Sequence, residues 1–220
     1  DTVNFQVYGN MEPQKAATEA VRETEGQILC QNGEAVEAYY FSTSAGVTST
    51  DEIWGSDEAA PYLRSVPCKF DEEEPWSSWI VELPWKMLED RIREKGEGTV
   101  LRSVTVTRRS ESGAATALEA VSDKDSCIIE NEYEIRKFLA PVNCMITEKD
   151  GTETAGGSLL PSAYFELERT QNGNLQVRGK GYGHGVGMSQ TGADKMAEQG
   201  YDYREILDYF FRNITVENLG

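Results

Sequence analysis

The chain has 220 residues, with 38 acidic and 21 basic side chains for a net charge of −17, and 39% of its residues are hydrophobic. This length and composition predict a folded protein with a sizeable core. The negative charge argues against nucleic acid and anionic lipid as partners, and the apolar runs fall short of the roughly 20 residues that a membrane-spanning helix needs. We therefore expect no nucleic-acid and no membrane contact from these residues.

The first predicted elements are a helix over residues 13–25 and a hairpin after it. Pro13 suits the first turn of a helix, and Gly26 is a typical stop. The strands of the hairpin cover residues 27–30 and 35–43, around an Asn-Gly turn that favours tight hairpins. Ser42 and Ser44 follow the apolar part of the second strand.

The middle of the chain predicts an ordered loop, a strand and helix, and a second hairpin. Residues 47–66 carry Trp54, Gly55 and Pro61 among small polar residues, which is typical of an ordered loop. The remaining predictions here are a strand over 79–83, a helix over 84–96 with Trp85, Leu88 and Ile92 on one face, and a hairpin of 100–106 with 117–121.

The last third predicts two helices and a third hairpin. A helix is expected over residues 130–139, with Ile135, Phe138 and Leu139 inside, and strands 164–167 and 175–177 should flank Asn172-Gly173. The final helix repeats apolar residues at helical spacing: Tyr203, Ile206, Leu207, Phe210 and Phe211. Without regular strand and helix alternation, the fold class is α+β: mixed hairpins and helices around a glycine-alternating strand, in a single domain over residues 1–220, with two lobes and a middle lobe at 76–160 as an alternative.

Two charged or reactive groups leave alternatives open. The acidic run of residues 71–74 reads as a solvated loop, with a Ca²⁺ site or a cationic partner as the alternative. Cys30, Cys68, Cys127 and Cys144 share no short spacing. They fit buried free thiols, one disulfide or a metal cluster.

The most unusual segment is residues 179–190, where glycine occupies every second position from 179 to 187. In an extended strand this pattern leaves one face without side chains, which allows close approach of a backbone, a ring or a sugar. A tightly packed structural strand is the alternative. The glycines do not form a dinucleotide or phosphate-binding motif, and no nucleophile elbow surrounds Ser189.

His184 is the one histidine of the chain, so these residues cannot form a multi-histidine zinc site. It is either a buried hydrogen-bonding residue or a residue that lines a site. Thr191 and Asp194 after it resemble a capping box at the start of a helix.

Residues 179–200, continued by Tyr203-Arg204-Glu205-Ile206-Leu207, resemble the terminal signature of the SpoIID/LytB family, a G-H-G-V-G-M-S-Q-x-G-A run followed by a Y-x-x-I-L helix. Residues 41–46, Trp54 and residues 61–66 also resemble the order and spacing of that family.

The resemblance implies a lytic transglycosylase of sporulation and engulfment. In such an enzyme a glutamic acid protonates the glycosidic oxygen after N-acetylmuramic acid, and the 6-hydroxyl of the sugar closes a 1,6-anhydro ring. The implied substrate is the glycan strand of peptidoglycan, on the cell-wall side of the membrane. The expected substrate-binding residues, by family position and by the glycine-rich segment, are Ser42, Ser44, Thr48, Tyr62, Arg64, His184, Ser189 and Gln190. Without the resemblance, Thr48, Tyr62 and Arg64 equally fit a turn hydroxyl, a packed aromatic and a surface cation.

Two departures from the family pattern shape these expectations. The catalytic glutamate of the family lies in a Glu-Met-Pro segment before an alanine-rich helix, which is not found here, so we expect the acid upstream and the present segment alone to be inactive. Glu12 resembles a later position and is expected to be only an acid in an early helical turn. Asp1-Thr2-Val3-Asn4-Phe5 stands where some relatives have zinc ligands, so no metal and no cofactor is expected.

The chain opens without an initiator methionine and looks trimmed at its front. Two other functions stay open: a module that binds glycan without cutting it, or enhances amidases as the LytB side of the family does, and a structural member of an engulfment complex that contacts wall-remodelling proteins.

Overall fold

The computed structural model describes residues 12–219, and it confirms the α+β class. In the described residues the helices are α1 Lys15–Glu23, α2 Trp85–Glu94, α3 Glu132–Phe138, α4 Gln190–Glu198 and α5 Tyr203–Phe210, with 3₁₀ turns η1 Asp51–Trp54 and η2 Pro75–Ser77. The strands form four sheets without a regular strand and helix alternation. Contacts divide the chain into two compact units, residues 37–214 and a smaller unit of residues 12–36 with 215–219.

The smaller unit contains α1 and a three-stranded antiparallel sheet in the order β13-β1-β2. The strands are β1 Gln27–Gln31, β2 Glu34–Ala35 and β13 Thr215–Asn218. Asn32 (φ 53°) and Gly33 (φ 81°) confirm the predicted turn. The expected strand over 35–43 is confirmed only in part: Glu34 and Ala35 pair with β1, and Tyr40–Phe41 forms a separate strand, β3. Glu12 precedes α1 and does not lie in its first turn.

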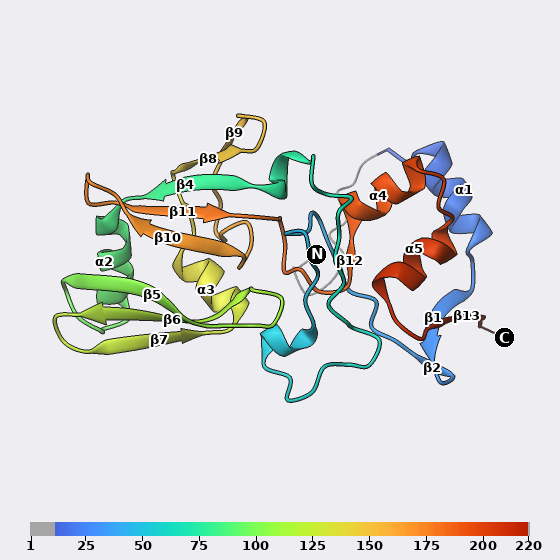
Figure 1. Cartoon of the computed structure of the whole chain (residues 1–220), viewed down its shortest axis with the longest axis horizontal. Coiled ribbons are helices and arrows are strands. Elements are labelled where there is room, and N and C mark those ends of the chain that lie inside the picture. The colour runs from blue at the N-terminus through green and yellow to red at the C-terminus, as the bar shows by residue number, and fades with distance from the viewer. Residues whose placement is uncertain (1–11, 220) are drawn as a thin grey trace. The chain divides into compact units, whose positions relative to one another are not determined.

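The core of the larger unit lies between two sheets. One has the order β10-β11-β4-β8-β9, and the other is β5-β6-β7. Figure 1 shows α2 and α3 between them. The bounds are β4 Trp79–Leu83, β5 Leu101–Arg109, β6 Ala115–Ser122, β7 Ser126–Glu130, β8 Met145–Glu148, β9 Glu153–Ala155, β10 Phe165–Arg169 and β11 Leu175–Gly179. The expected hairpins β5-β6 and β10-β11 are confirmed, whereas β7, β8, β9, β12 and β13 were not predicted from the sequence.

Helical periodicity explains how α2 and α3 fill the space between the sheets. Leu88 and Ile92 of α2 are fully buried, as the spacing of apolar residues predicts. Ile135, Phe138 and Leu139 at α3 are buried in the same cluster of apolar side chains. This cluster draws on residues 79–177; the middle lobe over 76–160 stays a prediction.

A short parallel pair holds the C-terminal helices of the larger unit. β12 Met188–Ser189 pairs with β3 Tyr40–Phe41 and leads directly into α4. The N-cap of α4 is Ser189, whose Oγ accepts from Gly192 N–H, so the capping box of Thr191 with Asp194 is wrong. In α5, Ile206 and Phe210 are buried but Tyr203 is 43% exposed, and the buried Phe211 lies just beyond the helix.

All four cysteines are free thiols, and Cys30 and Cys68 are buried. Across residues 12–219, no helix combines the length and the apolar character needed to cross a bilayer.

Candidate functional site

The glycine-rich segment is a loop and not a strand. β11 ends at Gly179, and Gly181, Gly183, Gly185 and Gly187 have φ of 75°, 115°, 85° and 80°. These are left-handed backbone angles that side chains with a Cβ rarely adopt. The expected extended strand is therefore wrong: glycine recurs because every second residue from Gly181 to Gly187 has a positive φ.

The same glycines also allow close packing of chain on chain. A methyl group on Gly181 would lie 2.8 Å from the carbonyl oxygen of Thr43, and one on Gly187 would overlap the carbonyl of Tyr39. At Gly183 it would lie 2.7 Å from Cβ of Phe41. The loop thus packs directly on the segment that carries the predicted Ser42 and Ser44.

Backbone hydrogen bonds fix this packing. Thr43 and Tyr182 exchange two bonds of 2.8 and 3.0 Å, and Ser49 N–H donates to the Gly185 carbonyl at 2.6 Å. Thr48 continues the framework, because its Oγ donates to the carbonyl of Arg64 at 3.2 Å and accepts from Val66 N–H at 3.0 Å. The structure therefore joins three segments that carry predicted site residues: 42–48, 62–64 and 179–190.

Asp71 is the polar centre of this framework. It is 1% exposed and accepts from Ser44 N–H (2.8 Å), Ser189 Oγ (2.9 Å), Thr191 Oγ (2.7 Å) and the thiol of Cys68 (3.3 Å). Burial, with the nearby Asp71 charge, raises the pKa of the Cys68 thiol to about 12. The reading of residues 71–74 as a solvated loop is wrong at Asp71, since far parts of the chain bury it.

The predicted substrate-binding residues divide by exposure. Thr48, Ser44 and Ser189 are buried and bonded inside the framework. The side chains of Arg64 and Gln190 are exposed, and Ser42, Tyr62 and His184 are half-buried. A ligand can reach the exposed and half-buried residues. The buried residues hold the backbone that carries them.

A series of contacts connects Tyr62 to His184. The hydroxyl of Tyr62 accepts from Glu37 N–H at 3.3 Å, and the Glu37 carboxylate accepts from the Tyr39 hydroxyl. That bond is the main cause that raises the pKa of Tyr39 to about 12. The Tyr39 ring meets Trp54 edge-on at 5.0 Å, and Trp54 meets the His184 ring at 5.2 Å. We call these residues, Tyr62, Glu37, Tyr39, Trp54 and His184, the aromatic face.

His184 is held in the aromatic face as a neutral ring. Its Nδ1 accepts from Val186 N–H at 3.1 Å, and Phe41 packs at 5.7 Å. Burial lowers the pKa of His184, and the charge of Arg136 acts in the same direction, while the charge of Glu132 opposes both. Because Nδ1 accepts the bond from Val186, the neutral ring carries its proton on Nε2, which can only donate a hydrogen bond.

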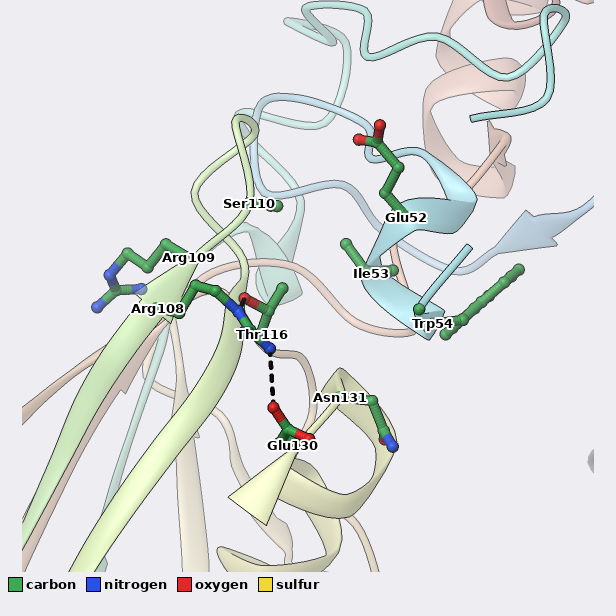
Figure 2. Close-up of a pocket in the computed structure, with 10 residues that line it drawn as sticks. Glu52, Ile53, Trp54, Arg108, Arg109, Ser110, Thr116, Glu130 and Asn131 are labelled. Carbon is green, nitrogen blue, oxygen red and sulfur yellow. Dashed lines mark hydrogen bonds and ion pairs between the residues drawn. The ribbon is translucent and has the colours of Figure 1, made fainter. Parts of the chain in front are cut away.

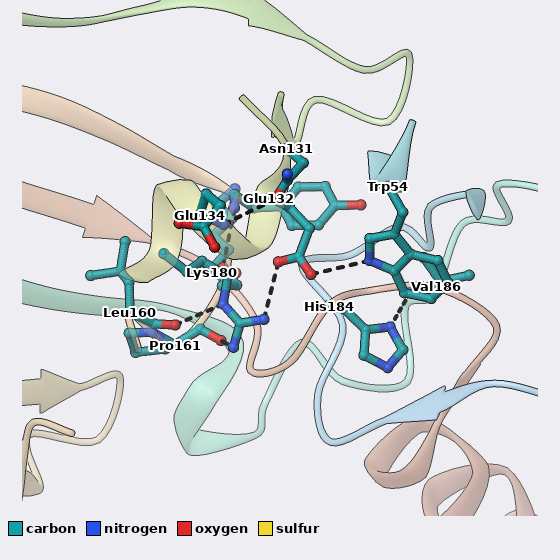
Figure 3. A network of polar contacts seen from close by, with 12 residues as sticks. Trp54, Asn131, Glu132, Glu134, Leu160, Pro161, Lys180, His184 and Val186 are labelled. Atoms are coloured by element: carbon teal, nitrogen blue, oxygen red, sulfur yellow. Dashed lines mark hydrogen bonds and ion pairs between the residues drawn. The ribbon is translucent and has the colours of Figure 1, made fainter. Parts of the chain in front are cut away.

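A buried ion pair holds Trp54 in place (Figure 3). Glu132 accepts from the Trp54 indole N–H at 3.2 Å and from Arg136 at 3.1 Å, and the two charged side chains are 3% and 10% exposed. Arg136 also donates to the carbonyls of Leu160 and Pro161. Buried charges with all partners satisfied fix geometry more than they add stability.

A pocket of about 430 Å³ opens beside Trp54 (Figure 2). Its walls carry charges of both signs, among them Glu52 and the pair of Arg108 with Glu130 at 3.3 Å. The volume lies within the range of small-molecule sites. Within residues 12–219, no three side chains of the metal-ligating types gather closely enough to hold an ion.

The buried carboxylates of Glu132 and Asp71 are both engaged by structural partners. Glu132 is ion-paired to Arg136, and the carboxylate of Asp71 is engaged by four donors. A general acid must instead present a proton to the leaving oxygen. The exposed aromatic rings and polar side chains can hold a sugar.

The sequence of this chain matches known proteins over nearly its whole length. A family described as a domain of unknown function, DUF8618, matches residues 68–187. The chain belongs to this family. DUF8618 thus covers the core of the larger unit and the alternating glycines through Gly187, and it ends just before β12.

Further relatives confirm the predicted resemblance. The chain is 31% identical to stage II sporulation protein D of Bacillus amyloliquefaciens and 30% identical to that of Bacillus subtilis (strain 168), each over 92% of the chain. It is 24% identical to the amidase enhancer of Bacillus subtilis over 98% of the chain. It is homologous to these proteins, and it spans 51% of each sporulation protein and 34% of the amidase enhancer.

Sequence reasoning missed Asp71, Glu132 and Tyr39. Asp71 lay in an acidic run and Glu132 in a helix with an apolar face, so neither had a local signal. Their partners are separated from them by up to 120 residues. Tyr39 did have a local signal, because it lies three residues before Ser42, a predicted site residue.

Proposed function

We propose that this chain carries the glycan-binding part of a peptidoglycan lytic transglycosylase of sporulation, acting on the cell-wall side of the membrane. The observation that carries the proposal is the homology to stage II sporulation protein D over 92% of the chain. The aromatic face supports it, because exposed rings beside polar groups are well suited to the apolar faces and hydroxyls of sugars.

The proposed reaction cleaves the strand after N-acetylmuramic acid. A glutamic acid gives its proton to the glycosidic oxygen, the C1–O bond breaks, and the 6-hydroxyl attacks C1 and releases its proton to the same carboxylate. The product has a 1,6-anhydro end and no water is consumed. We place the acid outside these 220 residues, since the buried carboxylates of the described part are occupied by structural partners.

In this proposal Tyr62, Arg64, His184, Ser42 and Gln190 contact the glycan. Tyr62 and His184 occupy the two ends of the aromatic face, and Arg64 is exposed next to Tyr62. Ser44, Thr48 and Ser189 are positioning residues that hold the loop and its neighbours. Wall-remodelling proteins are proposed partners.

The test is incubation of the chain with purified sacculi, followed by mass spectrometry of the soluble fragments. We expect the chain to sediment with sacculi and to release no 1,6-anhydro fragments, because removing a general acid costs a factor of about 10² to 10⁴ and its positioning is lost as well. Release of such fragments would place a catalytic acid within this chain, with Glu12, Asp51 and Glu52 the first to replace.

A second candidate is a module that enhances an amidase without cutting glycan. Alignment with the amidase enhancer over 98% of the chain favours it. Adding the chain to a wall amidase acting on sacculi separates the two: a higher rate of peptide release supports enhancement, and an unchanged rate supports the transglycosylase.

A further inference from the structure

A second pocket is lined by the pair Trp76 and Tyr182. Its volume is about 330 Å³, near the lower end for sites that hold small ligands. The two rings meet edge-on with centroids 4.6 Å apart, and Tyr182 is 43% exposed. We propose that this pocket is a second saccharide subsite that takes an uncharged N-acetylhexosamine of the same glycan; the proposal rests on the proposed function.

The rings of this pair are held by the loop itself. Gly181 N–H donates to the Trp76 carbonyl at 2.9 Å, and Tyr182 and Thr43 exchange two backbone bonds. Gly181 must be glycine for both its φ of 75° and its contact with Thr43. A platform fixed before binding loses little entropy when a ligand arrives.

The charge of the pocket points to a neutral ligand. Arg136 is the one charged side chain among its lining residues, and that side chain is 10% exposed. Its guanidinium is occupied by Glu132 at 3.1 Å and by the carbonyls of Leu160 at 2.9 Å and Pro161 at 3.3 Å. Arg136 is therefore not available to attract a carboxylate. The carboxylate of a peptide stem has no other cation among the lining residues of this pocket. A neutral sugar can stack on the rings and bond to the hydroxyl of Ser158.

The pocket and the aromatic face share one rigid support. Arg136 forms the floor of the pocket, and its partner Glu132 holds the indole of Trp54. On the loop, Tyr182 and His184 are separated by Gly183 alone, so their Cα atoms lie within about 7 Å of each other. In the proposal, neighbouring sugars of one strand contact His184 and Tyr182, and the strand passes along the loop.

The test measures calorimetric binding of a neutral N-acetylglucosamine hexamer to the whole chain and to three variants. Tyr182→Ala should weaken binding about tenfold, the scale of one aromatic contact. Tyr182→Phe keeps the ring and should bind normally. Tyr133→Ala removes a tyrosine of similar exposure (41%) that does not line the pocket, and it should also bind normally.

A second measurement does not depend on a variant that must fold. In nuclear magnetic resonance spectra of the unmodified chain, the indole N–H signal of Trp76, assigned through Trp76→Phe, should shift as hexamer is added. Equal hexamer affinity in Tyr182→Ala, or a Trp76 signal that stays in place while hexamer binds, would overturn the subsite and leave the proposed function standing. Binding to sacculi without binding to the hexamer would also overturn the subsite. Binding to neither would overturn both proposals.

Discussion

Asp71 joins three parts of the chain that are far apart in sequence, residues 42–44, 68–71 and 189–191. Four donors surround one buried carboxylate, so each donor loses its acceptor if the carboxylate changes. Hydrogen bonds to a charged group contribute more than those to a neutral one. At the scale of single residues, this carboxylate links the segment of Ser44 to the start of α4 at Ser189 and Thr191.

Asp71→Asn should lower the free energy of unfolding by about 2–3 kcal/mol, because an amide turns two donors toward groups that also donate. Glu73→Gln is the matched control, since its side chain lies in the same acidic run but is 91% exposed, and it should change stability by less than about 0.5 kcal/mol. Urea unfolding measures both. Equal effects of the two changes would mean that Asp71 has no special structural role.

Gly187→Ala should destabilise the protein by about 3 kcal/mol or more, because a methyl group meets the carbonyl of Tyr39 and the residue must keep φ at 80°. Gly200→Ala separates the two causes. Gly200 has φ of 94° but nothing within 4 Å of its added Cβ, so only the backbone strain of about 1–2 kcal/mol should remain. Similar losses in the two variants would show that close packing of the loop is not required.

The lowered pKa of His184 predicts a pH effect on stability. The unfolded chain takes up a proton near pH 6.5, before the folded chain does, so the contribution of His184 is complete above that pH and is lost as pH falls. His184→Asn should therefore lose less stability than the unmodified chain between pH 7.5 and 5.5. Because this is the one histidine, the difference belongs to it. A larger loss in the variant would contradict the buried neutral ring.

At the scale of elements, α3 connects two parts of the proposed site. Glu132 at its start binds Trp54 at the end of η1, and Arg136 one turn later binds the chain at residues 160–161. Asn131 caps the helix, with its side chain accepting from Glu134 N–H at 3.0 Å. The helix thus positions the ring of Trp54, which belongs to another element.

Arg136→Met should cost about 3 kcal/mol or more, since it leaves Glu132 buried without a cation. Adding Glu132→Gln should restore part of that loss, because the second change removes the unpaired charge. Lys137→Met is the control on the same helix: its pair with Glu134 is 3.8 Å long and exposed, and its loss should stay below about 0.5 kcal/mol. Urea unfolding of Arg136→Met, Glu132→Gln and the double variant gives the coupling energy. Additive effects would contradict a structural ion pair.

Local pattern predicted those elements whose signal lies within a few residues. The spacing of Leu88 and Ile92 predicts α2, and Asn32-Gly33 predicts the first hairpin, because periodicity and turn angles are local properties. The burial of Asp71 and the bond from Trp54 to Glu132 depend on packing across 27 to 120 residues. The glycine alternation identified the correct loop, but a period of two fits both an extended strand and alternating left-handed turns.

At the scale of the molecule, the net charge of −17 disfavours an anionic partner. The aromatic face and the pocket lined by Trp76 and Tyr182 are the parts of the proposed site that suit an uncharged polymer. Binding and cleavage are separate in this account. In the proposed function the described residues bind glycan, and an acid outside these 220 residues breaks the bond.

The most direct test is sedimentation of the chain with purified glycan strands, compared with Trp54→Ala and with Tyr201→Ala. Trp54 lies at the centre of the aromatic face, and its ring is 36% exposed, while Tyr201 is 42% exposed and packs against Phe70. We predict binding by the unmodified chain and by Tyr201→Ala, and about a tenfold weaker affinity for Trp54→Ala. Equal binding by all three proteins, or no binding by the unmodified chain, would contradict the account.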